Sequence, residues 1–431
     1  MLKKVAIITY YWPPSGGAGV QRWLKFTKYL PENGWQPIVF IPENANYPSI
    51  DDSLEKDIPK EAIIYKIPIW EPYDLYRKFA GLPKNHKISH TFNDGKSVSS
   101  WKNKISLWLK SNLFIPDPRL FWFFSGRRRI LEILKKHEID IFITTSPPNS
   151  IQLFGLYLKK HLPEVKWIAD FRDPWTEIFF NKTLPKTFIS RLIDKRLEAK
   201  VLKSCDRILT VSENWVDYFN KLSNSKKTFY IPNGFDRIFE NIEINYKKFT
   251  LVYTGTLFNI YDMPLLWIVL NDLLFENNSF KKDLQILIAG SVSEDIKFNI
   301  KKTELNHNIE FLGYINNNQL DELYKKATCL MITTPTENDH GIIPAKVFEY
   351  LSTGKPIISI SNKNNGLSKI ILTSKAGIVV SYDDYNHLKS VILDFYAKFN
   401  NKDITTNSFE HFKKYSRQNL THQLSEYLNN L

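Results

Sequence analysis

Cysteine is scarce in this chain of 431 residues, which contains two, Cys205 and Cys329. They lie far apart inside apolar segments, so we expect buried free thiols in a reducing compartment and no disulfide scaffold. Long hydrophobic runs are also missing, because no run approaches the roughly 18–20 apolar residues that a spanning helix needs. The short apolar run 5–12 ends in Pro-Pro-Ser-Gly-Gly. It predicts a first buried strand and its turn, and argues against a signal peptide.

Acidic residues are outnumbered, with 45 Asp and Glu against 58 Lys and Arg, which gives a formal net charge of +13. This excess favours anionic partners such as nucleotide sugars, anionic lipids or nucleic acid. No recognisable nucleic-acid-binding motif accompanies the charge, so we expect no nucleic-acid partner. The apolar content of 43% is that of a globular protein, and the length suits two domains.

Short apolar segments alternate with helical patterns, first through residues 5–231 and then again from residue 250. The strands expected in the first series are 5–10, 36–41, 141–145, 167–170, 207–211 and 228–231. This alternation predicts the α/β class, with two Rossmann-like doubly wound parallel-sheet domains. The polar segment 236–248 follows an Asn-Gly turn and marks the boundary. We therefore expect an N-terminal domain over 1–240, a C-terminal domain over 241–407, and a terminal helix over 408–431.

One region, about 68–130, breaks the alternation and is aromatic, basic and irregular. If residues 101–110 form a helix, Trp101, Ile105, Trp108 and Leu109 share a stripe with lysines beside it. That pattern suits contact with an anionic membrane surface. The alternative is an insertion that packs on the core of its own domain and leaves its lysines in solvent.

The most specific motif is Pro344-Ala-Lys-Val-Phe-Glu-Tyr350, which is followed by Gly-Lys-Pro at 354–356. It predicts a helix start, and Lys346 and Glu349 would share one face of that helix. Free N–H groups, the helix dipole and the lysine favour phosphate, while the glutamate accepts hydrogen bonds from a ribose diol. The structural alternative is an ordinary surface salt bridge.

This motif resembles the nucleotide-sugar site of glycosyltransferases with two Rossmann-like domains that face a cleft, the GT-B fold, and in particular the retaining family 4. The resemblance implies that Lys346 and Glu349 act on the donor and that the terminal helix packs back on the first domain. It also implies further donor-binding positions. They are Gly16, Gly17, Gly255, Thr256, Gly290, His340, Gly341, Ile342, Ile343 and Pro344.

The loop at 13–20 is glycine-rich, but it lacks the dinucleotide fingerprint, because Arg22 occupies the third glycine position. In the first domain, Asp170, Arg172 and Asp173 follow an apolar strand and resemble acceptor-binding residues of some bacterial family members. A local ion network is the structural alternative. Many family 4 members place a histidine near the transferred sugar, where this chain has Ser146. Either the Ser146 hydroxyl substitutes for that histidine in catalysis, or this part of the family's site does not carry over.

We therefore expect a retaining glycosyltransferase that moves a sugar from a nucleotide diphosphate sugar to a glycan or lipid-linked acceptor in cell-envelope polysaccharide biosynthesis. No Asp-x-Asp motif lies between apolar runs, so we expect no metal, and no cofactor besides the nucleotide-sugar substrate. The expected location is cytoplasmic, with peripheral contact at the inner membrane face left open.

Two alternatives remain. The chain lacks the family's Arg/Lys pair after residue 257, and Gly341 occupies the position of its first glutamate. Both losses are compatible with a degenerate GT-B scaffold subunit that binds without turnover. A nucleotide-sugar epimerase of the same fold is disfavoured, because the nine histidines are scattered.

Overall fold

The computed structural model describes residues 2–70, 101–178, 181, 183–239, 243–336 and 341–431. It contains two compact units. Unit 1 comprises Met1–Asn233 together with Arg417–Leu431, and unit 2 comprises Gly234–Ser416. The chain therefore leaves unit 1 within the Asn-Gly turn, between Asn233 and Gly234, and its last fifteen residues belong to unit 1 again.

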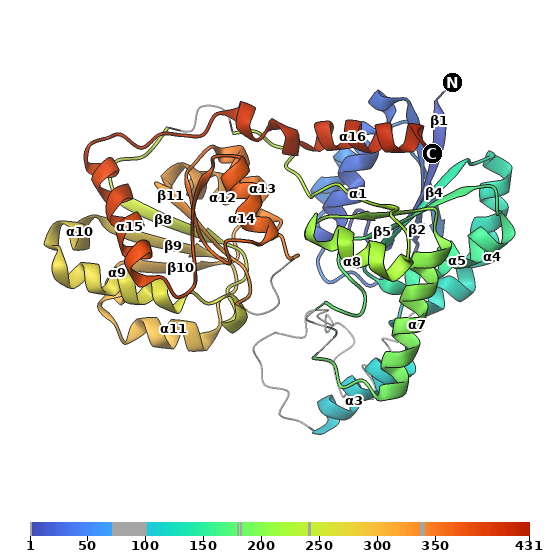
Figure 1. The fold of residues 1–431 in the computed structure, drawn as a ribbon, viewed down its shortest axis with the longest axis horizontal. Coiled ribbons are helices and arrows are strands. Elements are labelled where there is room, and N and C mark those ends of the chain that lie inside the picture. The colour runs from blue at the N-terminus through green and yellow to red at the C-terminus, as the bar shows by residue number, and fades with distance from the viewer. Residues whose placement is uncertain (1, 71–100, 179–180, 182, 240–242, 337–340) are drawn as a thin grey trace. The chain divides into compact units, whose positions relative to one another are not determined.

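Unit 1 is built on a seven-stranded parallel sheet with the order β3-β2-β1-β4-β5-β6-β7 (Figure 1). The order reverses between β1 and β4, and ligands of open α/β sheets bind where such a reversal occurs. The strands are β1 (Lys3–Ile8), β2 (Trp35–Pro42), β3 (Ile63–Ile67), β4 (Ile141–Ser146), β5 (Lys166–Phe171), β6 (Arg207–Thr210) and β7 (Thr228–Tyr230).

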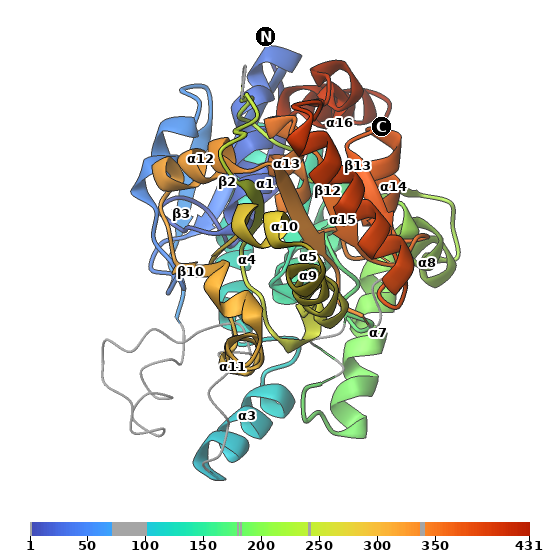
Figure 2. The same ribbon diagram turned by 90° about the vertical axis from the view of Figure 1, so that its left-hand side faces the viewer.

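Helices cover both faces of this sheet and bury two apolar layers. One layer joins the sheet to α1 and α16, and includes Trp23 and Leu424. The other joins it to α4, α5, α7 and α8, and includes Trp122 and Phe154. The helices of unit 1 are α1 (Ala18–Tyr29), α3 (Trp101–Leu113), α4 (Leu120–His137), α5 (Gln152–His161), α7 (Phe188–Ser204), α8 (Asn214–Ser223) and α16 (Arg417–Asn429). Figures 1 and 2 show α3 and the N-terminal end of α7 protruding from this body.

Unit 2 repeats the architecture with a six-stranded parallel sheet of order β10-β9-β8-β11-β12-β13. Here the order reverses between β8 and β11. The strands are β8 (Phe249–Thr254), β9 (Leu284–Ala289), β10 (Ile309–Gly313), β11 (Cys329–Thr333), β12 (Ile357–Ile360) and β13 (Gly377–Val380).

The helices of unit 2 also bury an apolar layer on each face of the sheet. They are α9 (Pro264–Glu276), α10 (Asn278–Asp283), α11 (Glu294–Lys301), α12 (Asn317–Lys326), α13 (Lys346–Thr353), α14 (Gly366–Thr373) and α15 (Tyr385–Asn400). Both cysteines are buried and free, Cys205 in unit 1 and Cys329 in unit 2.

The structure confirms two parallel-sheet α/β units and corrects three details. Strand β3 was absent from the sequence prediction, and the region expected to be irregular contains α3 and most of α4. The terminal helix begins at Arg417 instead of Ser408, since short 3₁₀ turns precede it. Among the described residues, no helix has both the length and the apolar character that crossing a bilayer requires.

Candidate donor site

Three neighbouring strands of unit 2 end in glycines whose backbones stack closely. The N–H of Gly255, after β8, donates to the carbonyl of Ala289 at 2.7 Å, and the N–H of Gly290 donates to the carbonyl of Gly313 at 2.7 Å. A Cβ at Gly290 would lie 2.2 Å from the carbonyl oxygen of Gly255, and its φ of +125° also disfavours other residues. Only glycine fits there, so this edge of the sheet presents bare backbone.

Helix α13 places Lys346 against this glycine edge. The Nζ of Lys346 lies 3.8 Å from the ring centroid of Tyr253, the residue before Thr254 at the end of β8. The same nitrogen would lie 3.1 Å from a Cβ at Gly255, whose φ is +99°. Among the residues that the structure describes, Nζ has no hydrogen-bond or ion-pair partner. Lys346 thus offers a cation beside exposed backbone at the point where the strand order reverses.

Buried tyrosines fix the orientation of α13. The N–H of Thr254 donates to the hydroxyl of Tyr350 at 2.8 Å, which ties the helix to the end of β8. Tyr324 is buried, and its hydroxyl donates to Oε2 of the exposed Glu349 at 3.3 Å. Lys346 and Glu349 are therefore held on one face of a helix that cannot rotate freely.

The environment of Lys346 opposes its charge. Burial lowers its pKa from 10.5 to about 7, and the nearby carboxylate of Glu349 offsets this only in part. A large shift caused by burial beside a specific charge is a common mark of a binding or catalytic lysine. An anionic ligand at this point would restore the ammonium form.

The loop that enters α13 contains four of the predicted donor residues. Gly341 is buried, while Ile342, Ile343 and Pro344 are half-buried directly before the helix. The carbonyl of Pro344 accepts from the N–H of Val347 at 3.0 Å, which closes the first turn. The predicted contact His340 lies outside the described residues. Thr256 is exposed and follows Gly255 in the same turn.

In unit 1, the glycine-rich loop joins β1 to α1. Gly17 has a φ of +84° and caps α1. The N–H of Gly16 donates to the carbonyl of Ser49 at 2.9 Å, and a Cβ there would lie 3.0 Å from the Ser49 hydroxyl. The loop is thus pinned to the segment after β2, and Gly17 remains exposed at the start of the helix.

Asp170 belongs to a buried network and not to an open surface. Its Oδ2 accepts from Trp23 Nε1 and from Thr145 Oγ1, both at 2.7 Å, and its Oδ1 lies 3.4 Å from Arg22 Nη2. Its side chain is fully buried. The ion-network alternative therefore describes Asp170, and the prediction of a direct acceptor contact is not retained for it.

Arg172 and Asp173 lie on the turn after β5. Arg172 Nη2 donates to the carbonyl of Gly19 at 2.6 Å, so this turn is joined to the glycine-rich loop. Asp173 is half-buried, and burial raises the pKa of its carboxyl to about 6 although Arg172 opposes the shift. A half-buried carboxyl with a raised pKa is suited to hold an acceptor hydroxyl or to take its proton.

Ser146 does not present its hydroxyl to a ligand. It is 1% exposed, its Oγ donates to the carbonyl of Asp170 at 3.3 Å, and it accepts from Gln152 Nε2 at 3.1 Å. The hydroxyl therefore links β4, β5 and the start of α5. The structure gives it a structural role, and the predicted substitution for the family histidine is not retained.

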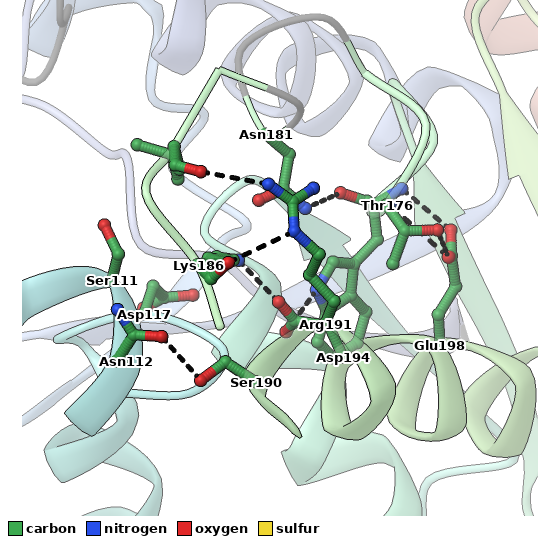
Figure 3. Close-up of polar contacts among 12 residues, drawn as sticks. Ser111, Asn112, Asp117, Thr176, Asn181, Lys186, Ser190, Arg191, Asp194 and Glu198 are labelled. Carbon is green, nitrogen blue, oxygen red and sulfur yellow. Dashed lines mark hydrogen bonds and ion pairs between the residues drawn. The ribbon is translucent and has the colours of Figure 1, made fainter. Parts of the chain in front are cut away.

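Sequence analysis missed a pair of carboxylates on α7 that hold the turn carrying Asp173. Glu198 accepts from the backbone N–H groups of Trp175 at 2.8 Å and Thr176 at 3.3 Å, and Asp194 accepts from Lys186 Nζ at 2.5 Å (Figure 3). Both carboxylates are 1% exposed. Their spacing of four residues beside the apolar positions of α7 was the signal available in the sequence.

The comparisons agree with this geometry. Residues 100–238 match the family model described as glycosyltransferase family 4, and residues 234–418 match that of glycosyl transferases group 1. The chain belongs to the family 4-like GT-B glycosyltransferases. The resemblance drawn from the Pro344–Tyr350 motif is therefore confirmed, and glycosyl transfer is the activity of the family.

Solved structures confirm the GT-B fold of this glycosyltransferase. Sucrose-phosphate synthase from Thermosynechococcus elongatus matches with a TM-score of 0.63 and 12% identity, covering 99% of this chain and 98% of that one. HepE from Anabaena, solved with UDP-glucose, matches with a TM-score of 0.61 and 11% identity, covering 99% and 100%. A curated relative is the processive diacylglycerol beta-glucosyltransferase of Bacillus licheniformis, 25% identical over 227 residues. The match covers 50% of this chain and 51% of that relative, so it spans about half of the relative's length.

Proposed function

We propose that this GT-B glycosyltransferase takes its sugar from a nucleoside diphosphate sugar, which binds to unit 2 at α13 and the glycine edge. The observation that carries the proposal is the position of Lys346, whose ammonium group lies beside Gly255 and over Tyr253. It meets the diphosphate, while Glu349 accepts hydrogen bonds from the ribose. Gly255 is exposed and Gly290 is half-buried, and the absence of a side chain at both positions leaves room for the base.

Catalysis in this proposal is the stabilisation of the leaving diphosphate. Lys346 and the N–H groups at the start of α13 are the donors that would meet its charge. The sugar is transferred with retention of configuration and without a metal. Asp173, on the turn after β5, contacts the acceptor hydroxyl, and Arg172 holds that turn against Gly19.

The test is a transfer assay with variants of the two donor residues. We expect Lys346→Ala and Glu349→Ala each to lose roughly tenfold to a few hundredfold in turnover, because a charge-assisted contact contributes about 1.5–3 kcal/mol. Lys326→Ala and Glu310→Ala alter exposed residues elsewhere in unit 2 and serve as matched controls. Full activity in both donor-site variants would refute the assignment, and the anomeric configuration of the product tests retention.

The proposed acceptor is a glycan or a lipid-linked molecule of cell-envelope polysaccharide synthesis, used on the cytoplasmic side of the membrane. Two observations support it. The curated relative is named for transfer to diacylglycerol, and the net charge of +13 suits an anionic membrane surface as partner.

A scaffold that binds a nucleotide sugar without turnover is the second candidate. It is favoured by the segment after Leu257, Phe-Asn-Ile-Tyr-Asp-Met, which has neither Arg nor Lys. Saturable donor binding with no transfer to any acceptor, and no hydrolysis, would support the scaffold over the enzyme.

A further inference from the structure

Helix α3 and the first turns of α7 form a joined projection on unit 1, which we call the α3–α7 platform (residues 104–113 and 184–196). Figures 1 and 2 show both helices extending from the body of the unit. Asn112 of α3 is the joint that connects this helix to the start of α7. Its Oδ1 accepts from the N–H of Thr187 at 2.7 Å and from Ser190 Oγ at 2.8 Å, and its Nδ2 donates to the carbonyl of Pro185 at 2.9 Å.

Further contacts make the α7 side of the platform an ordered structure. Lys186 Nζ lies 2.5 Å from Asp194 Oδ2, and both side chains are buried (Figure 3). Arg191 Nε donates to the carbonyl of Lys186 at 3.3 Å, and its Nη2 donates to the carbonyl of Leu184 at 3.2 Å. The segment that enters α7 is therefore fixed, and so is the direction in which its next residues point.

This ordered platform exposes large apolar side chains. Phe188 is 79% exposed and Ile189 is 68% exposed in the first turn of α7, and Leu113 is 64% exposed beside the joint. Ile105 and Trp108 are also exposed, and they lie three residues apart on one face of α3. Five exposed apolar side chains on the two helices of this projection indicate a surface that another phase or molecule covers.

The charge of the platform favours one kind of partner. Residues 104–113 and 184–196 contain six basic side chains and a single acidic one, Asp194, which is buried against Lys186. The exposed cations are Lys104, Arg191, Lys195 and Arg196. Apolar and aromatic side chains surrounded by uncompensated cations match the interface of an anionic bilayer. A second copy of the chain would bring like charges together, which opposes self-association.

We propose that the α3–α7 platform docks unit 1 on an anionic lipid bilayer, with Phe188, Ile189, Leu113 and Trp108 entering the headgroup region. The inference rests on the proposed function in one respect: an enzyme with a lipid-linked acceptor must reach the membrane. It does not depend on donor chemistry. Nucleotide binding can therefore fail while vesicle binding holds, and the reverse is equally possible.

The experiment places a reporter on the platform of the full chain. Both native cysteines are buried, and burial raises the pKa of Cys205 to about 12, so a thiol-reactive fluorophore would label an introduced cysteine selectively. Phe188→Cys tests the platform. Phe275→Cys on α9 is the matched control, because Phe275 is a similarly exposed phenylalanine, at 69%, in unit 2.

We expect a polarity-sensitive dye at position 188 to shift to the blue with vesicles of phosphatidylcholine and phosphatidylglycerol, but not with phosphatidylcholine alone. The dye at position 275 should stay unchanged. Replacing Lys104, Lys195 and Arg196 together by glutamine should weaken vesicle binding by roughly fivefold per residue, since each basic side chain near an anionic surface adds about that factor.

Three results would overturn the proposal. The first is no shift at position 188 with any vesicle. The second is an equal shift at position 275. The third is a concentration-dependent shift at position 188 without vesicles, which would show that a second copy covers the platform. A nucleotide titration of the same labelled protein reports separately on the donor site.

Discussion

Donor binding should weaken as the pH rises above neutrality, because of Lys346. Burial lowers its pKa to about 7 in the unliganded protein, so its amine is mostly neutral above that pH. A diphosphate near Nζ favours the ammonium form and raises the pKa of Lys346 in the complex. Binding above neutral pH must therefore take up a proton.

The direction and the size of the pH effect on donor binding follow from this proton uptake. Below pH 7 the amine is already charged, and affinity does not depend on its titration. Above that value, each pH unit should cost up to about 1.4 kcal/mol, a tenfold rise in Kd, until the pKa of the complex is reached. We expect the Kd of a nucleotide sugar to rise roughly tenfold to a hundredfold between about pH 7 and pH 9.

Calorimetric titration is the assay, repeated in buffers that differ in ionisation enthalpy so that proton uptake is measured directly. The ligand is the nucleotide sugar, whose diphosphate diester has no protonation step near neutral pH. Lys346→Met has no charge to gain, and Lys346→Arg remains charged throughout. Both variants should bind with little pH dependence. A wild-type slope equal to that of Lys346→Met would refute the reasoning.

Two further predictions concern backbone fit and buried charge. Gly290→Ala should lower the free energy of unfolding by about 1–3 kcal/mol or more and abolish nucleotide binding, because its Cβ would collide with Gly255. Gly313→Ala is the control, because φ at Gly313 is also positive but no atom lies near the added Cβ, so this variant measures the backbone strain alone. Equal losses of stability in thermal unfolding of the two variants would contradict the collision at Gly290. Burial raises the pKa of Glu198 from 4.5 to about 7, so the contribution of Glu198 to the free energy of unfolding should be fully present below pH 4.5 and should fall by up to about 3 kcal/mol as the pH rises from 4.5 through 7. Glu198→Gln should flatten this dependence in denaturant titrations, and an unchanged slope would contradict it.

The alternation of apolar segments predicted both sheets, because parallel strands buried on two faces are continuous apolar runs. Strand β3 was missed since it lies at the edge of its sheet and its residues are only partly buried. Helix α3 was considered only as a possibility over residues 101–110, and α4 was missed, because the region around them is aromatic and basic and breaks the regular alternation. The glycine edge was only partly foreseen, since the steric conflict at Gly290 depends on a strand distant in sequence.

In the candidate site too, sequence spacing predicted some features, while others depend on tertiary contacts. The spacing of Lys346 and Glu349 placed both on one helix face, but the lowered pKa of Lys346 depends on tertiary burial. In unit 1, the polar residues at the end of β5 and in the turn after it could not reveal that Asp170 is fully buried while Asp173 is only half-buried. The buried carboxylates Asp194 and Glu198 resembled solvated helix residues, because their partners come from a separate loop.

The central claim is that α13 and the glycine edge of unit 2 bind a nucleoside diphosphate sugar. The most direct measurement is a thermal-shift screen of wild type and Glu349→Ala against UDP, GDP, ADP, dTDP and CMP and their common sugars, without metal. We predict that one nucleotide stabilises the wild type by about 2.7 kcal/mol at a hundredfold excess over Kd, and that Glu349→Ala loses this shift. No shift with any nucleotide, or a shift that Glu349→Ala fully retains, would contradict the account.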